Sequence, residues 1–143
     1  MKKLNFKSTY DNGLDNEVID LCNALNSLPG ITTFESCCGH SSQPFSIWFN
    51  VNSSITYDGL FFITRCIDSR YWKYGYLWSI KLVVGDVFKN NILPIHYVLS
   101  SNPIVGEDAY TQAKDLIKNM NQHLNHKAFI KGFNINLNNF IIK

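Results

Sequence analysis

The sequence has no long apolar run and little net charge, and both absences exclude classes of protein. No stretch of about 18 apolar residues occurs, which excludes a membrane-spanning helix. The segment Met1–Lys7 turns polar at once and lacks the apolar run of a signal peptide, so we expect a cytoplasmic protein. The net charge of +2 is too small by itself to indicate nucleic acid, because that partner needs a concentrated basic face.

Cysteine is also scarce, and the four cysteines do not have the spacing of a disulfide framework. Cys22 and Cys66 lie among apolar residues and are interpreted as small core residues. The adjacent pair Cys37 and Cys38 stands apart, because it belongs to a polar loop that also contains a glycine and a histidine.

A single domain over residues 1–143 is the expectation from the length and from the 45% of hydrophobic residues, which can build one sizeable core. The periodicity of the apolar residues predicts helices over 15–27 and 55–68 and a third helix that begins after Gly106. Alternating or β-branched runs predict strands over 31–36, 45–52, 77–84 and 95–101. Gly59 counts against the second helix, because glycine is a poor helix former. The order α-β-β-α-β-β-α predicts an α+β fold with helices packed on a mostly antiparallel sheet.

The C-terminal segment 126–143 is too apolar to be a disordered tail. Two structures remain open for it, an added edge strand or a surface that packs on a neighbouring subunit. The second alternative predicts a homo-oligomer, because an apolar segment of this size needs a surface that covers it.

The loop between the first two strands is the most distinctive feature of the sequence. Gly39 permits a positive φ or the close approach of a ligand, and His40 exchanges protons near neutral pH. Ser36 and the backbone N–H groups that follow it, which include that of Cys38, can cradle an anionic oxygen. The structural alternative is a tight hairpin with a hydrogen-bonded histidine and partly buried thiols.

The same loop suggests two more specific chemistries, a reactive thiolate and a zinc site. Cys37 or Cys38 can form a thiolate–imidazole pair with His40, and His96 is another candidate base. No third catalytic group is identifiable. A zinc site needs ligands that turn toward one ion, whereas adjacent cysteines point apart in an extended chain. His123 and His126 are three residues apart, but a solvated helix end explains them as well. We therefore expect no metal and no cofactor.

A second cluster is aromatic and basic, and it contains both arginines of the chain. Aromatic faces stack on bases and guanidinium groups match phosphates, so this cluster predicts a nucleotide-binding surface. The alternative is that its aromatic side chains fill the core. The residues that we expect to bind ligand here are Arg65, Arg70, Tyr71, Trp72 and Trp78.

The segments 20–26, 32–33 and 36–40 together resemble the start of the tRNA wybutosine-synthesis methyltransferase family, over roughly residues 15–52. That family methylates a tricyclic guanine derivative in phenylalanine tRNA. His40 replaces the arginine of the family, and no segment for S-adenosylmethionine is recognised further along the chain. The resemblance implies a related fold with a cleft beside the loop.

A second resemblance covers most of the chain. It rests on the run Glu-Ser-Cys-Cys-Gly-His at 35–40 and on the segments 44–45, 47–49, 58–62, 64–66, 104–110 and 125–127. These segments are similar to a set of small phage-encoded proteins. Small phage proteins of this size often blunt host immunity, sometimes by sequestering nucleotide second messengers. The resemblance implies a viral protein of the host cytoplasm with an anti-defence role.

These observations lead to three hypotheses about function. The first is a protein that holds a small anionic ligand, a nucleotide, between the 36–40 loop and the 65–78 segment. The second is an enzyme on nucleotides or RNA, either a phosphodiesterase that uses His40 or a methyltransferase-like protein. The third is a protein-binding module without a small ligand. A nucleic acid is possible as partner but is not favoured.

Overall fold

The computed structural model describes residues 1–6, 14–74, 78–84 and 95–143, except for the side chains of 14–17 and 69–74. The helices are α1 (Leu14–Asn26), α2 (Asp58–Tyr74), α4 (Gly106–Leu124) and α5 (Lys127–Gly132), with short 3-10 turns η1 (Gly39–Ser41) and η2 (Leu137–Asn139). The strands are β1 (Ile31–Cys37), β2 (Pro44–Val51), β3 (Ser79–Val84) and β4 (Ile95–Val105). The predicted α+β class and the predicted order of elements are confirmed, although α2 and β4 extend several residues beyond the predicted ends.

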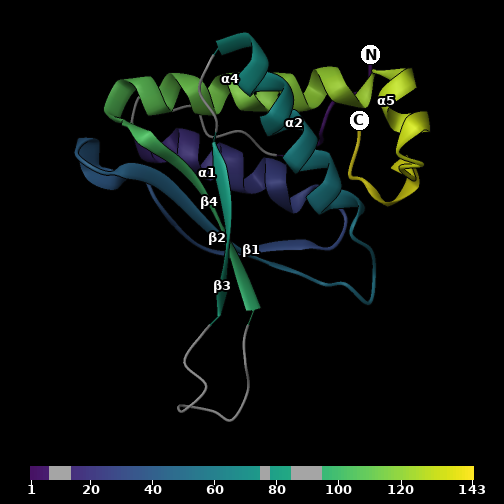
Figure 1. The fold of residues 1–143 in the computed structure, drawn as a ribbon, viewed down its shortest axis with the longest axis horizontal. Coiled ribbons are helices and arrows are strands. Elements are labelled where there is room, and N and C mark those ends of the chain that lie inside the picture. Colours follow the sequence, from purple (N-terminus) through teal and green to yellow (C-terminus); the bar gives the residue numbers. More distant parts are fainter. Residues whose placement is uncertain (7–13, 75–77, 85–94) are drawn as a thin grey trace.

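The four strands form one antiparallel sheet in the order β1-β2-β4-β3, with the helices gathered on one of its faces (Figure 1). The alternation along β2 explains this arrangement. Phe45, Ile47 and Phe49 are fully buried and point to the helices, as does Leu99 of β4, which is paired with Ile47. Because side chains alternate along a strand, every second residue of β2 and β4 faces away from the helices.

The opposite face of the sheet carries no helix within the described residues (Figure 1). Its residues on β2 are only half-buried or exposed, as at Trp48 and Asn50. Within the described part of the chain the fold therefore has two layers, and no described element covers the outer face of the sheet, which we call the open face. None of the described helices has the length and apolar character needed to cross a membrane.

The C-terminal segment does not extend the sheet. His126 caps α5, because its Nδ1 atom accepts a hydrogen bond from the Phe129 N–H at 3.0 Å. Phe129, Ile135 and Phe140 are then buried against the chain's own core, with the Phe140 ring edge-on to Phe62 at 5.2 Å. The segment is therefore not the edge strand that was one of its two expected structures, because it forms α5 and η2 and packs the rings of Phe129 and Phe140 on Phe62 of α2.

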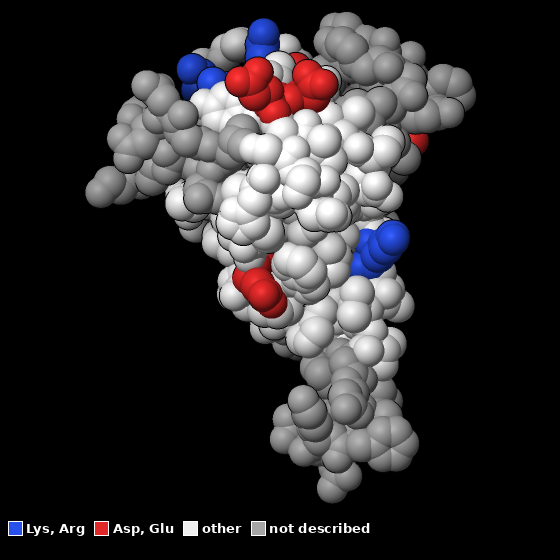
Figure 2. Space-filling model, turned by 90° about the vertical axis from the view of Figure 1, so that its left-hand side faces the viewer, with Lys and Arg blue, Asp and Glu red and all other residues white. Residues whose placement is uncertain are grey.

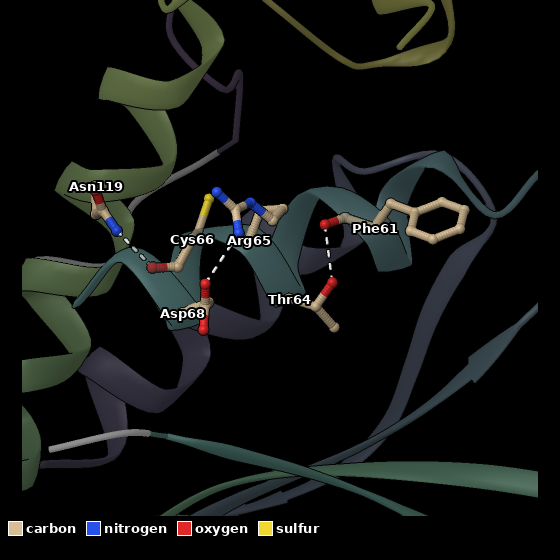
Figure 3. A network of polar contacts seen from close by, with 6 residues as sticks. All are labelled: Phe61, Thr64, Arg65, Cys66, Asp68 and Asn119. Atoms are coloured by element: carbon tan, nitrogen blue, oxygen red, sulfur yellow. Dashed lines mark hydrogen bonds and ion pairs between the residues drawn. The ribbon is translucent and has the colours of Figure 1, made fainter. Parts of the chain in front are cut away.

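Helices α2 and α4 are tied by a buried amide. The Asn119 side chain is 5% exposed, and its Nδ2 atom donates to the Cys66 carbonyl at 2.8 Å (Figure 3). Burying an amide without such a partner is costly, so this bond fixes how the two helices pack. Burial raises the pKa of the Cys66 thiol far above its usual range, which agrees with its interpretation as a core residue.

Gly59, which counted against the second helix, lies in the first turn of α2 against the turn that follows α1. A Cβ atom at this position would lie 2.4 Å from the Pro29 carbonyl oxygen and 3.1 Å from the Leu28 Cβ. The glycine is therefore required by the close approach of two backbones. Its low helix propensity is the cost of that contact.

We expect Gly59→Ala to destabilise the protein by about 1–3 kcal/mol, although alanine is the better helix former, because the methyl group forces two backbone segments apart. Gly132→Ala is the matched control, since nothing lies within 4 Å of a Cβ built at that helical glycine. Urea unfolding of both variants measures the difference. Equal stability of the two would contradict the close packing at Gly59.

Candidate functional site

The loop after β1 turns through a run of unusual backbone conformations. Gly39, His40 and Ser41 have φ values of +73°, +49° and +72°. A Cβ atom at Gly39 would lie 2.9 Å from the Pro44 carbonyl oxygen, so glycine is needed both for its φ and for space. The Gly39 N–H donates to the Cys37 Sγ atom at 3.3 Å, and its carbonyl accepts from Gln43 at 2.9 Å. The loop is thus a tight, internally bonded turn.

The predicted site residues of this loop point in different directions. Cys38 is 4% exposed and belongs to the core, whereas His40 is exposed. Ser36 lies beside Cys22 of α1, and its side chain hydrogen-bonds with the Cys22 thiol. Burial raises the pKa of Cys22, and the bond from Ser36 lowers it in part. The side chains predicted to share one ligand are therefore not gathered on one surface.

His96, the other candidate base for a thiolate of the loop, lies on β4 at a distance from Cys37. His96 faces Asn50, with 2.7 Å between its Nδ1 and the Asn50 Oδ1, and its ring contacts Phe34. Asn50 is four residues along β2 from Ser46, the partner of Cys37, or about 13 Å at the rise of a strand. His96 is thus too distant to act as a base for Cys37.

The surroundings of the loop are acidic. Ser41 lies beside Gly106, the first residue of α4, and the first turn of that helix carries the exposed residues Glu107 and Asp108. Figure 2, which views the molecule from the left-hand side of Figure 1, shows acidic side chains gathered in the upper part of this side, with basic side chains next to them. Carboxylates repel a phosphate group, so the loop is an unfavourable place for an anionic ligand.

The aromatic and basic cluster is also dispersed. Arg65 forms an ion pair with Asp68 at 2.9 Å (Figure 3). Its guanidinium group lies over the Phe133 ring at 5.4 Å from the centroid. It therefore faces the C-terminal segment. Trp78 is 3% exposed and cannot stack on a base at the surface, and its Nε1 atom has no hydrogen-bond partner among the described residues. The side chains of Arg70, Tyr71 and Trp72 lie outside the described residues.

The two histidines considered for zinc have structural partners instead. His123 and His126 stack at 6.4 Å between ring centroids. The His123 Nδ1 atom lies 3.0 Å from the Asn119 carbonyl oxygen, and the His126 Nδ1 atom caps α5. Among the described residues, no group of three or more His, Cys, Asp or Glu side chains is placed to hold a metal ion.

Two adjoining grooves lie at the other end of α4 and have a different character. The first, the α5 groove, has a volume of about 730 Å³ and is lined by Met1, Lys2, Leu124, Asn125, Lys127, Ile130, Lys131, Asn134, Ile135, Leu137 and Lys143. The second, the α4 groove, has a volume of about 540 Å³ and is lined by Met1, Lys2, Lys3, Lys114, Ile117, Lys118, Asn121, Gln122 and Asn125. They meet at Met1, Lys2 and Asn125, and neither lining includes an acidic residue among those described.

Asn121 of α4 and Asn125, the residue that follows this helix, position the N-terminal residues between the grooves. The Asn125 side chain accepts from the Lys2 N–H at 2.9 Å and donates to the Lys2 carbonyl at 2.8 Å. Asn121, one helical turn earlier, accepts from the Leu4 N–H at 2.8 Å. Leu4 also pairs with Ile142, and the Lys143 N–H donates to the Lys3 carbonyl at 2.9 Å. Both ends of the chain are thereby held beside α4.

This arrangement concentrates positive charge that the sequence disperses. Seven lysines line the two grooves, from positions 2 to 143. Six of them have no ion-pair partner among the described residues: Lys2, Lys3, Lys118, Lys127, Lys131 and Lys143. Unpaired like charges repel one another, so an anion bound between them is stabilised by every lysine that it approaches. Spacing along the chain did not reveal this cluster, since its members come from four separate segments.

No match was found when the chain was compared with protein-family models, with curated proteins and with solved structures. Function therefore has to be argued from the geometry of the chain itself.

Removing the amide that holds Lys2 tests how the grooves are built. We expect Asn125→Ala to lower the free energy of unfolding by about 1–3 kcal/mol, because two hydrogen bonds to the N-terminal backbone are lost. We also expect faster hydrogen exchange at Lys2 and Leu4, measured by mass spectrometry. Gln122→Ala is the control, since Gln122 is an exposed neighbour on α4. Unchanged exchange in Asn125→Ala would show that the N-terminal segment is held by other contacts.

The half-buried position of His123 predicts a pH dependence of stability. Burial lowers the pKa of this histidine, and the positive groups of His126 and Arg65 lower it further, although the bond to the Asn119 carbonyl opposes them. Its folded pKa is below the unfolded value, so its contribution to stability is complete above the unfolded pKa of about 6.5 and is lost as the pH falls below it. Urea unfolding at pH 7.5 and 5.5 should show a larger loss for wild type than for His123→Gln. An equal loss would contradict this assignment.

Proposed function

We propose that the protein binds a small phosphate-bearing ligand of the nucleotide class in the α4 and α5 grooves. The observation that carries the proposal is the set of six lysines that line these grooves without an ion-pair partner among the described residues, in a described lining that includes no acidic residue. Lysine ammonium groups are common phosphate ligands, and several of them at one site compensate several negative charges.

The remaining lining residues suit the other parts of a nucleotide. Ile130, Ile135 and Leu137 offer an apolar surface to a base or sugar in the α5 groove. The amide of Asn134, an exposed residue of the same groove, can hydrogen-bond the edge of a base. The volume of about 730 Å³ falls within the range of small-molecule sites, which is roughly 300–1,000 Å³.

Binding rather than turnover fits this lining. The described residues of both grooves include no His, Cys, Asp, Glu, Ser or Thr, so they lack the pairs that general acid–base or nucleophilic catalysis commonly uses. A protein that holds a nucleotide intact agrees with the resemblance to small phage-encoded proteins, and sequestration of a second messenger of host defence is the role that we infer for it.

Reversing one lysine charge tests the site. We expect Lys131→Glu to weaken the binding of ATP and of cyclic di-AMP by about tenfold, because an attraction to phosphate becomes a repulsion. Calorimetry at low protein concentration measures the affinity. Lys81→Glu is the control with the same change of charge, since Lys81 is an exposed residue of β3 outside both grooves.

His40→Ala distinguishes the two candidate places on the molecule. Affinity retained in His40→Ala and lost in Lys131→Glu supports the grooves. The reverse result would return the site to the loop. Mass spectrometry of the nucleotide released by heating tests the other part of the proposal, because an enzyme returns a changed product. If neither ATP nor cyclic di-AMP binds to the wild-type protein, the proposal is wrong.

A further inference from the structure

A row of four residues crosses the open face of the sheet. The strand register places Glu35 of β1 opposite Trp48 of β2, and Trp48 opposite Val98 of β4. Val98 in turn lies opposite Lys81 of β3. Because directly paired residues of antiparallel strands point to the same face, all four side chains project from one surface. The row reads Glu-Trp-Val-Lys from one edge of the sheet to the other.

This surface is the face that points away from the helices. Ile47, Phe49 and Leu99, the chain neighbours of Trp48 and Val98, are fully buried under the helices. Trp48 and Val98 are half-buried in the middle of the open face, and Glu35 and Lys81 are exposed on its two edge strands. The row thus has an apolar centre and opposite charges at its ends.

We propose that a second copy of this chain packs on the open face, related by a two-fold axis that runs parallel to the strands. Such an axis reverses the row of one protomer over the row of the other. Glu35 then meets the partner's Lys81, and Trp48 meets the partner's Val98. The symmetry repeats each contact, as an isologous interface requires, so each dimer contains the ion pair twice.

Two two-fold axes can lie in the plane of the interface, one parallel and one perpendicular to the strands. The charges at the ends of the row favour the parallel axis. An axis perpendicular to the strands places each row end over itself, so that Glu35 faces Glu35 and Lys81 faces Lys81. Like charges in contact oppose association, whereas the reversed row pairs opposite charges. Stacked sheets lie about 10 Å apart, a distance that Trp48 and the long Glu and Lys side chains can bridge.

The rows on either side contain little that opposes burial. Asn50 and His96 are already hydrogen-bonded to each other at 2.7 Å. Ser46 and Ser100, on the other side, are small and allow the two sheets to approach. Four strands about 4.8 Å apart make a face less than about 20 Å wide, so we expect an interface at the small end of the usual range and a reversible dimer.

Exchanging the two charges tests the arrangement. We expect sedimentation equilibrium of wild type to show a monomer–dimer equilibrium. Glu35→Lys or Lys81→Glu alone should weaken it by at least about tenfold, since each change converts two attractions into repulsions. An equimolar mixture of the two variants should form heterodimers with an affinity close to wild type, because both pairs become opposite in sign again. The double variant E35K/K81E should also recover the wild-type affinity.

Glu107→Lys, an equal change of charge at the start of α4, should leave the association unchanged. Circular dichroism of each variant checks that the exposed substitutions leave the fold intact. A wild-type protein that is monomeric at the highest soluble concentration overturns the proposal. So does a dimer that tolerates both single reversals, because its interface would then lie elsewhere, at a strand edge or on the C-terminal segment.

Discussion

Two hydrogen bonds join the Asn125 side chain to the Lys2 backbone. The end of the molecule opposite the 36–40 loop depends on this contact. They hold the N-terminal residues on α4, where Leu4 is buried and pairs with Ile142 near the C-terminus. The pairing of Leu4 with Ile142 adds to the burial of Phe129, Ile135 and Phe140, which packs the C-terminal segment on the core. The same contact brings lysines from both ends of the chain to one place, so the closure of the fold and the proposed binding site have one origin.

Charge is separated along α4. Glu107 and Asp108 occupy its first turn, beside the loop, and the lysine-lined grooves lie toward its other end. Acidic residues at the start of a helix and cations at its end both complement the helix dipole. The separation leaves the loop with the wrong sign for a phosphate ligand and the grooves with the right one. A net charge of +2 conceals this distribution, because net charge contains no information about position.

Residue patterns predicted the elements but could not supply the contacts between distant segments. The alternation in β2 and the helical spacing in α1 and α4 are local, and they identified both the class and the order of elements. Gly59 shows the limit, because its close approach to the Pro29 carbonyl joins two elements and is invisible to helix propensity. The loop shows it too, since adjacent Ser36, Cys38 and His40 take different directions once the backbone turns through positive φ values.

By itself the sequence predicted α1, α2, α4 and the four strands, the antiparallel sheet covered by helices and, as one alternative for the loop, a tight turn at Gly39, because periodicity and turn chemistry act over a few residues. Only the tertiary structure decided which charges meet, which aromatic residues are buried and which face of the sheet stays open. Trp78 is buried and Arg65 is paired with Asp68, although both were predicted to bind ligand. The physical reason is that electrostatic and packing energies depend on distance in space, and residues 2, 118, 131 and 143 become neighbours only after the chain has folded.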